Sequence, residues 1–224
     1  MSELLRVLEN EVQIAALLFM AAVYAVRLVW LFRFRSRKER ASAEGSEGAG
    51  IGRSLLNIAR PRDAESSRTR PGLYIQFVVF HLGVAVAIAA TFIIPYAPHI
   101  LESRAVVLFF QALIGAALVV ALMRLVRRLR NPALRAVSTP DDYAALVLMI
   151  LFFAAAVVAV PNDFHRSEAP LIAFFGLTAI FLITVPFTKI GHYLYYPFTH
   201  FYLGRTMGRR GVLPAKRHAE GETP

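Results

Sequence analysis

The chain has 224 residues, of which 57% are hydrophobic, and it carries a net charge of +10 and no cysteine. This composition is too apolar for an ordinary soluble domain and indicates a membrane protein. The lack of cysteine excludes disulfide bonds, covalent haem attachment through CxxCH and iron–sulfur ligation by this chain. The basic residues flank apolar stretches and do not alternate with aromatic residues, so we expect them to orient the chain in a membrane and not to bind nucleic acid.

Five apolar stretches are long enough to cross a bilayer, whose hydrocarbon core of roughly 30 Å needs about 20 helical residues. They comprise residues 12–31, 73–96, 105–126, 143–160 and 171–196. The sequence therefore predicts an all-α membrane protein, a bundle of five transmembrane helices. The first stretch is not a cleavable signal peptide, because acidic residues precede it and the basic run RFRSRKER follows it.

The positive charges predict the topology. Residues 33–72 carry ten Lys or Arg, the connection between the third and fourth spans carries five, and the end of the fifth span together with the chain after it carries six. The opposite side has only Arg6, Arg104 and Arg166. By the positive-inside rule we expect the N-terminus outside and the C-terminus inside. The expected parts are an outer segment 1–11, a five-helix domain 12–202 with a cytoplasmic linker 36–72, and a cytoplasmic tail 203–224.

The connections carry local signals. ASAEGSEGAG has the composition of a flexible linker, and the following IGRSLLNIAR is expected to form either a short amphipathic helix or a loosely ordered loop. STPDDY predicts a helix start, with Ser138 or Thr139 as the cap, Pro140 in the first turn and acidic residues at the positive end of the helix. GRRGVLPAKRHAEGETP is typical of a disordered end or a docking segment.

Two histidines lie inside apolar spans. His81 lies about 12 Å from the cytoplasmic start of the second span, at 1.5 Å per helical residue, and His192 lies near the cytoplasmic end of the fifth. Ionisable residues inside a membrane usually mark a functional site, and two imidazoles at one depth can ligate the iron of a b-type haem. The alternative is that each histidine only forms hydrogen bonds between helices. Pro186 and Gly191 indicate a bend just before His192.

The other histidines are weaker candidates. His200 follows His192 by about two helical turns and is an alternative ligand, although the aromatic residues around it are typical of a membrane interface. Haem propionates need cations at the cytoplasmic edge, and Arg124, Lys189 and Arg205 are the candidates that we retain. Most basic residues there are expected to serve only as topological anchors.

Three segments carry a resemblance to a known family: FHLGV around His81, RRLRNPALRAVSTPDDY before the fourth span, and PFTKIGHYLYYPF around His192. They resemble the gamma subunit of respiratory nitrate reductase, over roughly residues 10–212. The resemblance implies a five-helix membrane cytochrome b that passes electrons between membrane quinone and a redox partner subunit. It also implies a prokaryotic inner (cytoplasmic) membrane as the location of this multi-pass protein.

The departures from that family concern the second haem. Members with two haems carry two further histidines, where this chain has Thr91 and Phe174. Both ligands of the outer haem are missing together, while those of the inner haem remain. The chain is therefore most similar to mono-haem members, such as the cytochrome subunits of DsrMKJOP-type and Tmc-type complexes. STPDDY and the ending FxxGRTMGRRGVL add to this narrower resemblance.

The sequence thus predicts one haem b per chain, ligated by His81 and His192. The expected role is electron transfer between membrane quinone and a cytoplasmic partner, which the resemblance implies is an iron–sulfur protein similar to heterodisulfide reductase or a molybdoenzyme. Quinol oxidation or quinone reduction at this subunit is expected, but the sequence does not locate the quinone site. The alternative from a different class is a haem-free membrane scaffold or transporter subunit, against which the near absence of acidic residues in the spans argues.

Overall fold

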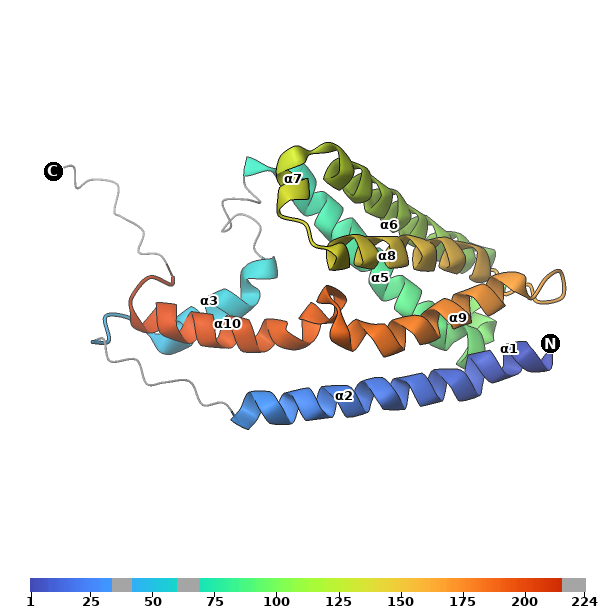
Figure 1. Ribbon diagram of the computed structural model, residues 1–224, viewed down its shortest axis with the longest axis horizontal. Coiled ribbons are helices and arrows are strands. Elements are labelled where there is room, and N and C mark those ends of the chain that lie inside the picture. The colour runs from blue at the N-terminus through green and yellow to red at the C-terminus, as the bar shows by residue number, and fades with distance from the viewer. Residues whose placement is uncertain (34–41, 60–68, 215–224) are drawn as a thin grey trace. The chain divides into compact units, whose positions relative to one another are not determined.

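The computed structural model describes residues 1–33, 42–59 and 69–214, and every regular element in those ranges is a helix (Figure 1). Five helical segments have the length and apolarity to span a membrane, as the sequence predicts. The chain is a multi-pass membrane protein. It contains two compact units, one of Met1–Leu31 with Ile75–Ile190 and one of Phe32–Tyr74 with Gly191–Pro224. The expected domain of residues 12–202 takes in segments of both units.

The first spanning segment begins earlier than expected. α1 (Glu3–Val7), the π-helical turn η1 (Leu8–Val12) and α2 (Gln13–Arg33) follow one another without a break. Ser2 caps this helix, because its side-chain oxygen accepts a hydrogen bond from the N–H of Leu5 at 3.2 Å. The expected outer segment 1–11 is therefore mostly the first turns of the spanning helix.

A buried hydrogen bond fastens this first helix to α9 (Ala169–Thr184), the last spanning helix. Gln13 donates from Nε2 to the carbonyl oxygen of Phe175 at 2.8 Å. Leu5 and Ala16 are buried on the same N-terminal half, whereas most of the remaining apolar side chains of α2 are exposed. Exposure of apolar side chains along a spanning helix is what a lipid-facing surface requires.

α5 (Pro71–Tyr96) and α6 (Arg104–Arg130) are the second and third spans, joined by the 3-10 turn η3 (Pro98–Glu102). They meet where Gly83 of α5 faces Ala117 of α6, and a Cβ atom at position 83 would overlap the Cβ of Ala117. Helices in lipid associate mainly through such close packing, because lipid tails are as apolar as the helix surfaces. The glycine at position 83 is thus a packing requirement.

The predicted helix start in STPDDY is confirmed. After the short helix α7 (Pro132–Ala136), α8 (Pro140–Ala159) begins with Thr139 as its N-cap and proline as its first residue. Asp142 completes a capping box, in which the N–H of Thr139 donates to Asp142 Oδ2 at 2.8 Å.

Phenylalanine rings fill the interior where α8 meets α9. Phe152 stacks on Phe174, with ring centroids 5.5 Å apart, and contacts Phe181 at 4.8 Å. Phe153 and Phe175 are fully buried beside them. Aromatic pairs at these separations add about 0.5–1.5 kcal/mol each beyond the area that they bury.

The fifth span ends sooner than predicted. The spanning segment stops at Phe187, where the 3-10 turn η4 (Val185–Phe187) follows α9, and a second turn, η5 (Lys189–Gly191), precedes α10 (His192–Arg209). The prediction of one span over residues 171–196 is therefore wrong at its C-terminal end. The break lies between Pro186 and Gly191, as the bend prediction required, because proline has no N–H to continue the helix.

The second unit contains α10 and an antiparallel partner, α3 (Glu47–Leu55), which continues into the turn η2 (Leu56–Ala59). The prediction of a flexible linker is wrong from Glu47 onward, because Ser46 caps a helix by accepting a hydrogen bond from Ala49 at 3.3 Å. Of the two alternatives for the following segment, the helix is confirmed as far as the described residues extend. Figure 1 shows α3 running alongside α10.

Small residues let α3 and α10 touch through their backbones. A Cβ atom at Gly204 would lie 2.6 Å from the carbonyl oxygen of Gly50 and 2.6 Å from the Cα of Ile51. A Cβ atom at Gly208 would lie 2.5 Å from the carbonyl oxygen of Ser46. Glycine pairs spaced four residues apart on α10 therefore form the contact surface, in the manner of GxxxG helix pairs.

Candidate functional site

His81 lies on the second span with its ring orientation determined by the helix itself. Its Nδ1 is 2.8 Å from the carbonyl oxygen of Phe77, one turn earlier on α5. Since a carbonyl oxygen only accepts hydrogen bonds, Nδ1 donates this bond, and in a neutral imidazole Nε2 is then the nitrogen without a proton. Metal-binding histidines usually donate the other ring N–H to such a carbonyl, which fixes the tautomer and the ring plane.

Aromatic rings and one cation surround this imidazole. The ring centroid of Phe77 lies 4.2 Å from that of His81, and that of Phe80 lies 5.7 Å from it. Phe80 also packs on Phe153 at 5.5 Å, which ties this end of α5 to the core. Arg124 of α6 places its guanidinium 4.9 Å from the centre of the Phe80 ring. The half-buried imidazole therefore has apolar walls and a nearby positive charge.

His192 occupies a different setting. It is the exposed first residue of α10, directly after η5, and it belongs to the second unit whereas His81 belongs to the first. His81 lies within its spanning helix as predicted, whereas the prediction that His192 lies inside the fifth span is wrong, because that span ends at Phe187 and His192 begins α10. The pairing of the two histidines stays a prediction. His200, the alternative ligand, has its Nδ1 hydrogen-bonded to Ser54 Oγ at 2.9 Å, so it takes part in the contact between α3 and α10.

A polar cluster that the sequence did not predict holds Lys189. The Lys189 ammonium donates to Asp142 Oδ2 at 2.9 Å and to Thr139 Oγ1 at 2.9 Å, and its backbone N–H donates to Asp141 Oδ2 at 3.1 Å. Arg128 lies 3.7 Å from the same Asp142 oxygen. The start of α8 therefore holds the first residue of the 3-10 turn η5 in place. One feature of the sequence could have indicated this cluster: STPDDY contains two acidic residues, whereas the capping box of α8 needs only Asp142.

Arg205 also has a defined partner within its unit. It donates to Glu47 at 3.0 Å, and Arg209 donates to the same carboxylate at 3.3 Å. The hydrogen bonds from Arg205 and then Arg209 hold the pKa of the Glu47 carboxyl below its ordinary value. Of the three predicted propionate contacts, Arg124 lies beside the residues that flank His81, whereas Lys189 and Arg205 form ion pairs with carboxylates.

Thr91 and Phe174, the two positions at which the sequence comparison expected a second ligand pair to be missing, take part in ordinary packing and hydrogen bonding. Phe174 is fully buried, stacked on Phe152 and 5.4 Å from Phe175. The hydroxyl of Thr91 donates to the carbonyl oxygen of Ile88 at 2.7 Å, within its own helix. Neither side chain presents a nitrogen or thiolate to a metal.

Within the described ranges, no group of three or more His, Cys, Asp or Glu side chains is arranged to hold a metal ion. A bis-histidine haem needs only two protein ligands, so this observation concerns other kinds of metal centre. Comparison of the chain with protein-family models, curated proteins and solved structures finds no match.

Proposed function

We propose that the protein is the mono-haem b subunit of a respiratory redox complex, carrying electrons between membrane quinone and a cytoplasmic iron–sulfur or molybdoenzyme partner. The observation that carries the proposal is the hydrogen bond from His81 Nδ1 to the Phe77 carbonyl within an apolar spanning helix. It gives the imidazole the tautomer that an iron ligand requires.

The residues around His81 fit a haem in two respects. Phe77 and Phe80 provide apolar contact for a porphyrin, and Arg124 provides a cation within reach of a carboxylate. His192, which belongs to the other unit, is the second ligand of the proposal. When bound, haem b supplies one-electron chemistry at iron, while the protein sets the potential through its ligands, burial and nearby charge.

The distribution of charge supports docking of the proposed partner on the cytoplasmic side. Of 25 basic residues, 21 lie on the side that the positive-inside rule assigns to the cytoplasm of a prokaryotic cell. An acidic face on a soluble partner would complement them. The cysteine-free chain leaves iron–sulfur chemistry to that partner. The resemblance to the nitrate reductase gamma subunit supports the same arrangement.

The test is the visible spectrum of the purified, dithionite-reduced protein. A low-spin b-type α-band is expected, and it should disappear in His81→Ala and in His192→Ala while both variants still insert in the membrane. His165→Ala, which changes a loop histidine outside the spans, is the matched control and should leave the band unchanged. An intact low-spin band in His192→Ala would assign the ligand to His200 or refute the pairing.

Haem stoichiometry provides a second test. The pyridine haemochrome assay should give one haem per chain, because Phe174 and Thr91 fill the positions of the second ligand pair. Two haems per chain would contradict this interpretation. A wild-type protein that binds no haem, even when expressed with added haem precursor, would instead favour the haem-free scaffold or transporter subunit.

A further inference from the structure

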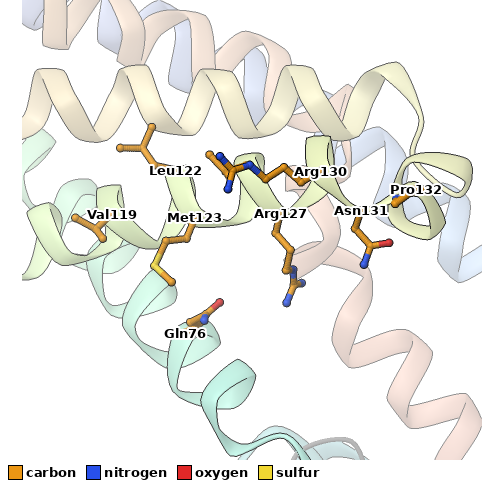
Figure 2. Close-up of a pocket in the computed structure, with 9 residues that line it drawn as sticks. Gln76, Val119, Leu122, Met123, Arg127, Arg130, Asn131 and Pro132 are labelled. Atoms are coloured by element: carbon orange, nitrogen blue, oxygen red, sulfur yellow. The ribbon is translucent and has the colours of Figure 1, made fainter.

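A groove opens between α5 and α6 on the first unit, with a volume of about 800 Å³. Gln76 of α5 lines one side, and Val119, Leu122 and Met123 are among the α6 residues that line the other. The two helices touch at Gly83, further along α5, and Figure 2 shows α5 passing away from α6 on the side of Gln76. The groove is thus the space left where two crossing helices separate.

The lining of the groove changes character along α6. Val119, Leu122 and Met123 are apolar and 55%, 44% and 50% exposed, within a spanning helix. About 6 Å beyond Met123 along the helix axis, at 1.5 Å per residue, the lining becomes polar with Arg127, and it continues to Asn131. Figure 2 shows Met123, Arg127 and Asn131 projecting from the same side of α6. The groove is therefore amphipathic, with an apolar body and a basic end.

Among the residues that the structure describes, the basic end of the groove has no acidic ion-pair partner. Arg128 pairs with Asp142, but within the described ranges no carboxylate forms an ion pair with Arg127. Arg130 also lines this end of the groove and adds a like charge. Two guanidinium groups at the end of a spanning helix favour an anion, and phosphate oxygens accept from the planar donor fork of arginine.

We propose that this groove binds an anionic phospholipid, with its phosphate headgroup at Arg127 and Asn131 and an acyl chain along Val119, Leu122 and Met123. Basic pockets between spanning helices are suited to acidic lipid headgroups, and the exposed apolar lining belongs to a membrane-spanning segment. A neutral quinone would leave the two arginines unmatched. The haem face is separate, since Gln76 and His81 are five residues and so about 140° apart around α5.

The proposal is tested on the full-length protein in detergent, with haem if it carries any, after removal of co-purified lipid. Native mass spectrometry measures binding of dioleoyl-phosphatidylglycerol and of dioleoyl-phosphatidylcholine, which have identical tails. The anionic lipid should bind more tightly. Arg127→Gln should weaken its binding by about fivefold, as expected for removal of one cation near an anionic lipid. Arg127→Lys should retain most of the affinity.

Two further variants separate the groove from overall charge and from misfolding. Arg135→Gln removes one positive charge on α7, outside the groove lining, and should leave lipid binding unchanged. Met123→Trp keeps every charge but fills the apolar part, and it should also block binding. Far-UV circular dichroism confirms that each variant keeps its helices.

Four results would overturn the proposal. Equal binding of the two lipids would exclude headgroup recognition. If Arg135→Gln weakened lipid binding as much as Arg127→Gln does, net charge alone would explain the effect. Complete competition by millimolar inorganic phosphate, with no contribution from the acyl chains, would indicate a free-phosphate site. Displacement of the phospholipid by an equimolar quinone would indicate a quinone site.

Discussion

A single methyl group at Gly50 should separate α3 from α10, whereas the same methyl group at Gly52 should stabilise α3. At Gly50 a Cβ atom would overlap the carbonyl oxygen of Gly204, and in the reverse direction a Cβ at Gly204 would lie 2.6 Å from the carbonyl oxygen of Gly50. At Gly52 a Cβ atom would have no heavy atom within 4 Å. The two substitutions are chemically identical and lie two residues apart on one helix.

The expected magnitudes follow from these contacts. Overpacking against backbone atoms costs about 1–3 kcal/mol, because neither helix backbone can yield without moving as a whole. The separation would also stretch the hydrogen bond between Ser54 and His200, at 2.9 Å, and that from Tyr196 to the Leu55 carbonyl, at 3.2 Å. Alanine in a helix is about 0.8–1 kcal/mol more favourable than glycine, so the substitution at the open position should stabilise.

Hydrogen exchange of the α3 amides at constant pH, followed by mass spectrometry, measures both effects in the full-length chain. Protection of residues 47–55 should fall by roughly 5- to 150-fold in Gly50→Ala, the factor that corresponds to about 1–3 kcal/mol. In Gly52→Ala it should rise by up to about fivefold. Changes of the same sign and size in the two variants would refute the close backbone contact.

Three further predictions concern polar contacts. Glu47 has a lowered pKa in the folded chain, so its contribution to pairing of α3 and α10 is present above the ordinary carboxyl pKa of about 4.3 and is lost as pH falls through the folded value. Thermal unfolding between pH 7 and pH 3 should therefore show a smaller pH dependence in Glu47→Gln, and an unchanged profile would contradict the ion pairs with the two arginines. Gln13→Leu removes a buried hydrogen bond between spanning helices and should lower the free energy of unfolding by about 0.6–1.7 kcal/mol in a mixed-micelle titration; a zero change would show that the Phe175 carbonyl needs no donor. Thr139→Ala removes the N-cap of α8 and should cost about 1 kcal/mol, whereas Thr184→Ala, which loses only a bond to a carbonyl of its own helix, should cost less; equal losses would argue against the cap.

The sequence was sufficient for the five spans because a bilayer imposes a strong local constraint. Every backbone polar group within the hydrocarbon must be paired inside its own helix, so length and apolarity alone locate a spanning segment. The start of α8 could also be predicted from local sequence, since Thr139, Pro140 and Asp142 act within one turn. The end of the fifth span could not be predicted in this way, because residues 188–196 are apolar and aromatic enough to continue the pattern of a spanning helix beyond the break at Pro186.

At the candidate site, the sequence pointed to His81 and Arg124 as candidate residues. The structure added the contacts of these two side chains, which the sequence does not show. The carbonyl of Phe77 sets the His81 tautomer, and the Phe80 ring brings Arg124 to the same end of α5. Lys189 was predicted to meet a haem propionate, yet it lies against Asp142 of another helix. Ion pairs of this kind depend on which helix ends come together, and the residues near Lys189 in the sequence do not indicate which helix end lies beside it.

The sequence by itself therefore determined the membrane class, the number of spans and the cap of α8, since each depends on residues close together in the chain. Tertiary structure decided that Gly50 and Gly204 bring α3 and α10 into backbone contact, and that Phe174 packs in an aromatic core. It also decided that α5 and α6 separate to leave a basic groove at Arg127. These features depend on distances between segments far apart in the chain, and such distances are set by how whole helix surfaces fit together.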